Sequence, residues 1–321
     1  MTVRIHRVLP LCLTVTALSG CGAGGERSLV GGGSNTAELA IQAWQSSLAS
    51  KDITLTYRSN GERVGAQEFY QGTADVVISA RDSLASSNGR IEVEKKQSYV
   101  RIPMLVADIA IAYIEPGCRL SLTKQSLTAV FTGHINSYAQ LGCGDSPLTV
   151  LTREQDSGTR QSLYKYLGIS DGSRQRSDRW IKSEPVVTRN MANVISSVSG
   201  GFGYIPGPLL RFHNVSIVKV KSGYGKSYLP RISPHAAESQ EEFSRDIGSR
   251  SVEGSQDYPI KNVTYLYIKK NGNGRKLTAL RELARFAISD KAQEVAMSKG
   301  YIRLSQEQVR QGLVAIQEIT D

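Results

Sequence analysis

The sequence predicts an α/β fold with largely parallel sheets. Strand-like runs at 28–30, 53–57 and 148–151 are each followed by a polar turn and then by apolar residues at helical spacing. No repeat of fixed period and no low-complexity tract interrupts this alternation. The chain has 321 residues, which is enough for two domains of ordinary size, and its hydrophobic content of 40% is normal for a globular protein.

Strands are predicted where short apolar runs alternate with polar residues or are rich in β-branched residues. They fall at 28–30, 53–57, 75–79, 104–114, 148–151, 200–206 and 263–268. Helices are predicted where apolar residues recur every three or four positions. They fall at 37–49, 64–71, 123–131, 161–167, 277–289 and 291–298. The segment 222–257 has weak periodicity and many polar residues, so it is predicted to be a loop.

The N-terminus predicts export and lipid anchoring. A basic start precedes an apolar core at 8–18 that is too short to span a bilayer, and a sequence typical of a bacterial lipobox ends at Cys21. We therefore expect a signal peptide at 1–20 and a lipid-bearing tether at 21–27. The alternative is an ordinary signal peptide followed by a chance cysteine. No other segment is apolar enough to span a membrane, so the body is expected to be soluble and extracytoplasmic.

The net charge of +10 and the pI of about 9.4 favour anionic ligands or surfaces, and solubility alone is the alternative reason for this charge. Nucleic acid is a poor candidate, because no motif of interleaved basic and aromatic residues is present and the expected location is wrong. The histidines show no metal-ligand spacing, so neither a metal nor another cofactor is expected. These histidines are His6, His134, His213 and His235.

An oxidising compartment outside the cytoplasmic membrane permits disulfides. Cys12 leaves with the signal peptide and Cys21 takes the lipid, so Cys118 and Cys143 remain. A single bridge between these two cysteines is plausible. Two free thiols are the alternative.

The stretch 153–159 predicts an anion site. It lies between a strand-like run and a helix start, where backbone N–H groups and hydroxyls meet the positive end of a helix dipole. Arg153 adds a forked guanidinium that suits two oxygens of a phosphate. The alternative is a capped helix without a ligand, because Ser157 is also a good N-cap.

Three further polar turns, at 34–36, 59–61 and 79–82, follow other predicted strands. Ligands of open α/β sheets bind beyond the carboxyl ends of the strands. The four turns are therefore expected to converge on one site, which strengthens the anion-site interpretation of 153–159.

Several segments resemble one known family, the periplasmic-type phosphate-binding lipoproteins of ABC importers. The likeness covers nearly the whole mature chain, and its most specific part is the Arg-x-x-x-Ser-Gly-Thr signature at 153–159. The other matching segments are 31–44, 57–61, 72–82, 121–133, 201–204, 258–270 and 300–302.

The resemblance implies a two-lobed periplasmic binding protein fold of type II, with a hinge of two crossing strands. The crossing strands would be 104–114 and 258–268. Lobe one would comprise 28–108 and 259–321, and lobe two 109–258. Closure of the lobes over one ligand is the usual motion of such proteins.

By matching positions, the resemblance also implies a phosphate-binding set. Its members are Asn35, Thr36, Ser59, Asp82, Arg153, Ser157, Gly158 and Thr159. Asp82 is assigned the discriminating role, because a buried carboxylate accepts a hydrogen bond from protonated phosphate but repels sulfate. The alternative is that Asp82 ends its strand in solvent or pairs with Arg81.

Two departures from the family pattern accompany this assignment. Asp156 stands where the family usually has glycine, and we expect Arg160 to form an ion pair with Asp156 or with Glu154. The first turn reads Ser34-Asn35-Thr36, where the family often has Ala-Thr-Phe or Ser-Thr-Thr.

The expected function is capture of inorganic phosphate for the permease of an ABC importer, by a monomer anchored to the membrane through lipid, without catalysis. Sulfate or molybdate binding, and a surface phosphate sensor or adhesin, are the alternatives. A serine-type hydrolase is more remote, because the Ser-x-x-Lys pattern at 121–124 lacks its companion motifs.

Overall fold

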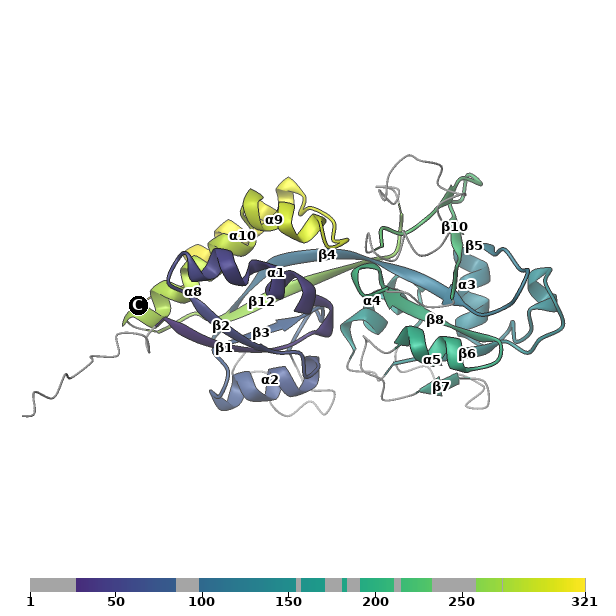
Figure 1. Ribbon diagram of the computed structural model, residues 1–321, viewed down its shortest axis with the longest axis horizontal. Helices are drawn as coiled ribbons and strands as arrows, with labels where there is room; N and C mark the ends of the chain where they lie inside the picture. Colours follow the sequence, from purple (N-terminus) through teal and green to yellow (C-terminus); the bar gives the residue numbers. More distant parts are fainter. Residues whose placement is uncertain are drawn as a thin grey trace, which may run out of the picture.

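Two long strands, β4 (Tyr99–Tyr113) and β12 (Lys261–Lys269), run through the middle of the molecule and join two lobes (Figure 1). They are antiparallel neighbours from the pair Lys261–Asp108 to the pair Lys269–Tyr99. The computed structural model describes residues 27–84, 98–153, 157–170, 181–183, 191–210, 215–232, 258–272 and 274–320. The predicted two-lobed α/β fold with a hinge of two crossing strands is confirmed.

The first lobe is built on the strand order β2-β1-β3-β12-β4. Its own strands are β1 (Ser28–Gly33), β2 (Thr54–Arg58) and β3 (Val76–Ser79). The helices α1, α8, α9 and α10 cover one face of this sheet, and α2 covers the other (Figure 1). Their bounds are α1 Glu38–Ala49, α2 Glu62–Gln71, α8 Gly274–Ala287, α9 Asp290–Met297 and α10 Gln306–Gln317.

The second lobe continues the sheet in the order β4-β8-β6-β7, and a smaller sheet of order β11-β10-β5 lies beside it. Its helices are α3 (Lys124–Phe131), α4 (Gly158–Leu167) and α5 (Met191–Ser197). Its strands are β5 Ser121–Thr123, β6 Thr149–Thr152, β7 Ile181–Ser183, β8 Gly201–Pro206, β9 Ser216–Ile217, β10 Lys219–Lys221 and β11 Ser227–Tyr228. The described residues also form short 3₁₀ turns, η1 Asn35–Ala37 in the first lobe and η2 Ala139–Leu141 and η4 Gly207–Leu209 in the second.

The sheet is mixed, which corrects the expectation of largely parallel pairing. Strands β1, β2 and β3 are parallel, and so are β6, β7 and β8. The hinge strands break this pattern, since β12 is antiparallel to both β3 and β4, and β4 is antiparallel to β8. The chain leaves the first lobe along β4 and returns along β12, and this return requires opposite directions.

Each lobe has its own apolar core. Residues of β4 up to Ala107 pack in the first core, and residues from Ile109 onward pack in cores of the second lobe. Ile260, just before β12, belongs to the second core, and Leu266 of β12 belongs to the first. We propose that the lobe boundaries lie close to the expected positions, at these two crossing segments.

Cys118 and Cys143 form a disulfide, with their Cα atoms 5.6 Å apart. Both half-cystines pack against the core of the second lobe. The bridge closes a loop with a sequence separation of 25 residues, and such a loop limits the unfolded chain. The expected bridge is therefore present, rather than two free thiols.

The helix α10 follows the last predicted element, and the sequence interpretation missed it. A capping box begins it, since Ser305 and Gln308 exchange side-chain and backbone hydrogen bonds. Gly312 of this helix packs near the sheet, where a Cβ would lie 3.3 Å from Ile288 Cγ2 and 3.4 Å from Ile102 Cγ2. Among the described residues, no helix is long and apolar enough to cross a membrane. The expected signal peptide and Cys21 lie outside the described residues.

Candidate functional site

The polar turns that end β2, β3 and β6 converge between the lobes. The carboxylate of Glu62, at the start of α2, accepts the backbone N–H of Ala80 at 2.9 Å and that of Gly158 at 2.7 Å. Ala80 follows β3 in the first lobe, and Gly158 begins α4 in the second. Glu62 therefore joins two of the predicted turns across the interface between the lobes.

The turn that ends β1 is fixed to the same region. Gly33 donates its N–H to Asn60 Oδ1 at 3.1 Å, and the phenol of Tyr57 donates to the Ser34 carbonyl at 2.8 Å. Asn35 and Thr36 follow in η1 and are buried. The expected convergence of the polar turns at this edge of the sheet is therefore seen in the structure.

Ser157 is the N-cap of α4, since its Oγ accepts the N–H of Arg160 at 3.4 Å. This agrees with the alternative interpretation of the stretch as a capped helix. The helix begins at Gly158, earlier than the predicted 161. Thr159 is buried, and its Oγ1 accepts a hydrogen bond from Asn262 of the hinge strand β12 at 3.4 Å. The cap and the candidate anion site thus use the same turn, and the two interpretations are compatible.

Arg153 follows β6 directly and is held by an aromatic side chain. Its N–H donates to the hydroxyl of Tyr204 at 3.1 Å, and the same hydroxyl lies 3.2 Å from Thr152 Oγ1. Burial raises the pKa of Tyr204 to about 12, so its phenol stays neutral at pH 7. Arg153 Nε and Arg81 Nε are both shielded from solvent.

Two polar atoms of the predicted site are buried without a hydrogen-bond partner among the described residues. They are Asn35 Oδ1 and Ser59 Oγ. A buried polar atom without a partner costs about 1–3 kcal/mol. Both atoms are therefore suited to contact a ligand.

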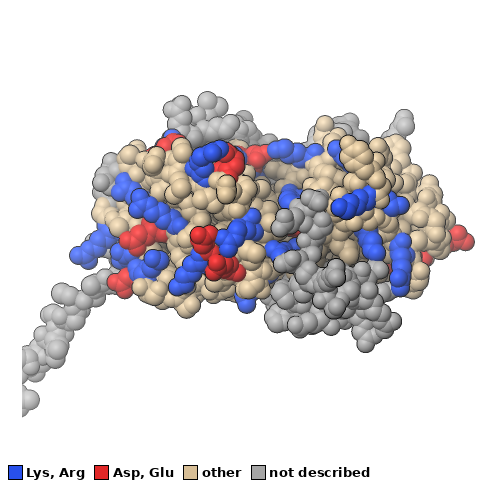
Figure 2. Space-filling model, turned by 90° about the horizontal axis from the view of Figure 1, so that it is seen from above, with Lys and Arg blue, Asp and Glu red and all other residues tan. Residues whose placement is uncertain are grey.

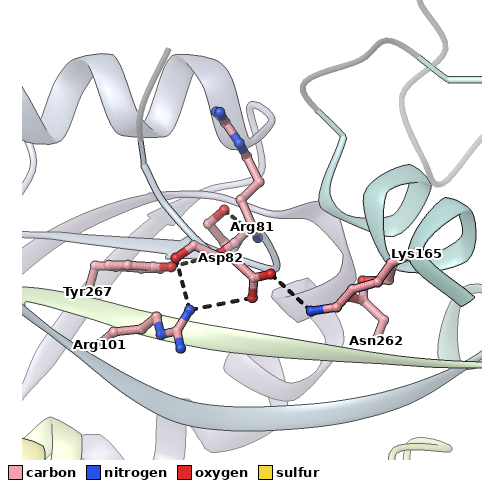
Figure 3. Close-up of polar contacts among 8 residues, drawn as sticks. Arg81, Asp82, Arg101, Lys165, Asn262 and Tyr267 are labelled. Carbon is pink, nitrogen blue, oxygen red and sulfur yellow. Dashed lines mark hydrogen bonds and ion pairs between the residues drawn. The ribbon is translucent and has the colours of Figure 1, made fainter. Parts of the chain in front are cut away.

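Asp82 does not lie in a buried pocket, so that part of its assignment is wrong. Its side chain is 70% exposed, and its carboxylate pairs with Arg101 at 3.5 Å and with Lys165 at 3.2 Å (Figure 3). The bend after β3 turns Arg81 inward, where it is 7% exposed, and Asp82 outward. In Figure 3 the Arg81 side chain extends away from Asp82.

Glu62 is the buried carboxylate that the sequence interpretation missed. Glu62 is only 8% exposed to solvent. Burial raises its pKa, while the N–H groups of Ala80 and Gly158 and the charges of Arg153 and Arg81 lower it. The prediction started α2 at Val64, whereas the helix begins at Glu62. An acid directly after Gly61 is typical of a first helical turn and was the available signal.

The sequence interpretation also named Asp156, Glu154 and Arg160. Asp156 and Glu154 lie outside the described residues, so their expected pairing with Arg160 stays a prediction. Arg160 donates to the Arg153 carbonyl at 2.8 Å, and its guanidinium lies 4.7 Å from the ring centre of Tyr164. In the described ranges, no cluster of three or more histidine, cysteine or acidic side chains could hold a metal ion.

The Ser-x-x-Lys pattern does not form a catalytic pair among the described residues. Ser121 lies in β5 with its hydroxyl 3.0 Å from that of Ser227. Lys124 begins α3, and its ammonium lies 5.3 Å from the ring centre of Tyr166. The serine and the lysine thus have different neighbours.

The chain has two α/β lobes with crossing strands between them, and a helix start faces polar turns. These features define the class of two-lobed solute-binding proteins. The chain belongs to the family described as PBP superfamily domain, whose model matches residues 21–291. The phosphate-binding protein PstS of Borreliella burgdorferi (strain ATCC 35210) is 21% identical over 160 residues, which cover 49% of this chain and 54% of that protein. PstS of Bacillus subtilis (strain 168) is 25% identical over 154 residues, with 48% of each chain covered. The chain spans about half the length of these curated relatives.

Solved structures resemble the whole fold. The phosphate-binding protein from Stenotrophomonas maltophilia superposes with a TM-score of 0.63 at 16% identity, covering 88% of this chain and 92% of that one. An ABC-type phosphate transport receptor from Vibrio cholerae superposes with a TM-score of 0.54 at 17% identity, covering 86% and 100%. At these identities the likeness establishes the fold.

Proposed function

We propose that this protein binds inorganic phosphate between its two lobes and delivers it to an ABC importer from outside the cytoplasmic membrane. The observation that carries the proposal is the buried start of α4. There the N–H of Gly158 donates to the Glu62 carboxylate of the first lobe, and the positive charges of Arg153 and Arg81 lower the pKa of the same carboxylate. Backbone N–H groups at a helix start, together with arginine, form a site suited to tetrahedral oxyanions.

The proposed ligand groups come from both lobes. Ser59 and Asn35 offer buried polar atoms from the first lobe, and Arg153 offers its guanidinium from the second. The other proposed contacts are Thr36, Ser157, Gly158 and Thr159. The exposed position of Asp82 does not favour contact with an enclosed anion. Phosphate, rather than another oxyanion, is supported by the names of the relatives described above.

The charge of the surface agrees with an anionic ligand. On the face seen in Figure 2, lysine and arginine side chains lie over both lobes, whereas most of the acidic side chains lie over the first lobe. A positive surface raises the local concentration of anions and their rate of association. We propose a lipid anchor at Cys21 and a monomeric state as part of the same function.

Isothermal titration calorimetry with phosphate, sulfate and molybdate at pH 7 tests the proposal. We expect phosphate to bind with a Kd in the micromolar range or tighter, about −8 kcal/mol or better. Sulfate and molybdate should bind at least tenfold more weakly. Equal or tighter binding of sulfate or molybdate would assign the site to a different oxyanion. A gene deletion that leaves phosphate uptake unchanged would favour a sensor or adhesin.

A further inference from the structure

A carboxylate of the first lobe already occupies donors that the proposed phosphate site needs. Glu62 Oε2 accepts the N–H of Gly158 at 2.7 Å, and Glu62 Oε1 accepts the N–H of Ala80 at 2.9 Å. Both distances are those of strong hydrogen bonds to a charged acceptor. The Glu62 carboxylate therefore binds the start of α4 in the way that a bound anion would.

The first residue of α4 packs closely against this carboxylate and against Ala80. A Cβ on Gly158 would lie 2.6 Å from Glu62 Oε2 and 2.7 Å from the carbonyl carbon of Ala80. The carboxylate thus packs directly against the first residue of α4. An oxyanion reaches the Gly158 N–H only after Glu62 has left it.

Among the described residues, four charged or titratable groups on the surrounding elements interact electrostatically with the carboxylate. Arg81 follows β3 and Arg153 follows β6, and their positive charges favour the ionised form of Glu62. Tyr57 of β2 and Tyr267 of β12 also face it. Burial raises the pKa of both phenols, so both stay neutral at pH 7. Among the described residues, two guanidinium groups and one carboxylate therefore supply the charge at this point.

We propose that Glu62 is a resident ligand of the anion site, which an oxyanion must displace from Gly158 and Ala80, and that this displacement selects phosphate over sulfate. The inference rests on the proposed function. Phosphate near pH 7 still carries a proton, and the displaced carboxylate can accept a hydrogen bond from it. Sulfate carries none, so Glu62 must take one proton from water or face a like charge.

The buried position of Glu62 supports this selection. Burial raises the pKa of Glu62, so this carboxylate takes up a proton at a higher pH than an exposed carboxylate does. Sulfate binding should then be coupled to the uptake of one proton by Glu62. Sulfate itself does not titrate between pH 5 and 8, so the pH dependence of its binding reports on the protein.

Calorimetry of Glu62→Gln with sulfate and phosphate tests the inference, with Glu282→Gln as the matched control. Glu282 lies on α8 and pairs with Arg27, so its substitution removes the same charge far from the site. At pH 7 we expect Glu62→Gln to bind sulfate at least tenfold more tightly than the wild type. The ratio of phosphate to sulfate affinity should fall at least tenfold. Glu282→Gln should match the wild type.

The proton coupling gives a second measurement. Titration of wild type with sulfate, in buffers of different ionisation enthalpy, should show the uptake of about one proton. Glu62→Gln should show none, and Glu62→Ala should behave like it if the glutamine variant folds poorly. Unchanged sulfate affinity in both variants, or no proton uptake in wild type, would overturn the role of Glu62. If the wild type still prefers phosphate in that case, the proposed function stands. If neither the wild type nor the variants bind phosphate or sulfate, the proposed function and the role of Glu62 both fail.

Discussion

Gly158→Ala is expected to weaken phosphate binding roughly a hundredfold, which corresponds to about 2.7 kcal/mol. The new Cβ would lie 2.7 Å from both the carbonyl carbon and the Cβ of Ala80, a distance that side chains do not tolerate. Ala80 belongs to the first lobe, so the contact is relieved only by moving the lobes apart. The helix itself accepts alanine, because Gly158 has no positive φ.

Calorimetry and thermal unfolding together check this expectation. Gly223→Ala is the matched control, because Gly223 has an ordinary φ and no atom lies within 4 Å of the point that its new methyl group would occupy. The control should bind phosphate as the wild type does. Both variants should melt within a few degrees of wild type. Unchanged phosphate affinity of Gly158→Ala would mean that the anion does not require this approach of the lobes.

Trp44→Ala should lower the free energy of unfolding by about 3–5 kcal/mol, as large-to-small changes in packed cores do. Trp44 is 0% exposed, and its indole meets the ring of Phe286 edge-on with centroids 5.7 Å apart. Its N–H donates to the Ala292 carbonyl of α9 at 2.9 Å. The substitution thus opens a cavity between α1 and α9 and also removes the hydrogen bond between them.

Urea denaturation at pH 7 measures this loss. Trp44→Phe separates the two contributions, because it keeps an aromatic ring but removes the N–H donor. We expect it to recover most of the stability and to lose about 1 kcal/mol for the hydrogen bond. A loss below about 1 kcal/mol for Trp44→Ala would show that this contact does not hold α1 to α9.

Much of the fold could be predicted, because its signals are local. Alternating strands and helices predicted the α/β class, and polar turns after the strands predicted that these turns converge between the lobes. The helix after the turn at Ser157 was predicted too, although it begins at Gly158 rather than at 161. The capping box at Ser305 was a readable signal for α10, which the sequence interpretation did not use.

The chemistry of the site depended on tertiary contacts that no local pattern carries. Gly65 lets α2 touch the end of β1, since a Cβ there would lie 2.6 Å from Gly33 Cα. That contact brings Glu62 to the interface between the lobes. The outward turn of Asp82 depends on the bend after β3, and its partners Arg101 and Lys165 come from β4 and α4. The family resemblance therefore placed a buried carboxylate at Asp82, whereas the structure buries that of Glu62.

A crystal structure of the protein with bound phosphate would test the central claim most directly. We expect the phosphate between the lobes, accepting the N–H of Gly158 and lying within hydrogen-bond distance of Arg153 and Ser59. The Glu62 carboxylate should have left Gly158 and should contact a phosphate oxygen. Phosphate bound elsewhere, with Glu62 still accepting the N–H groups of Gly158 and Ala80, would contradict the account.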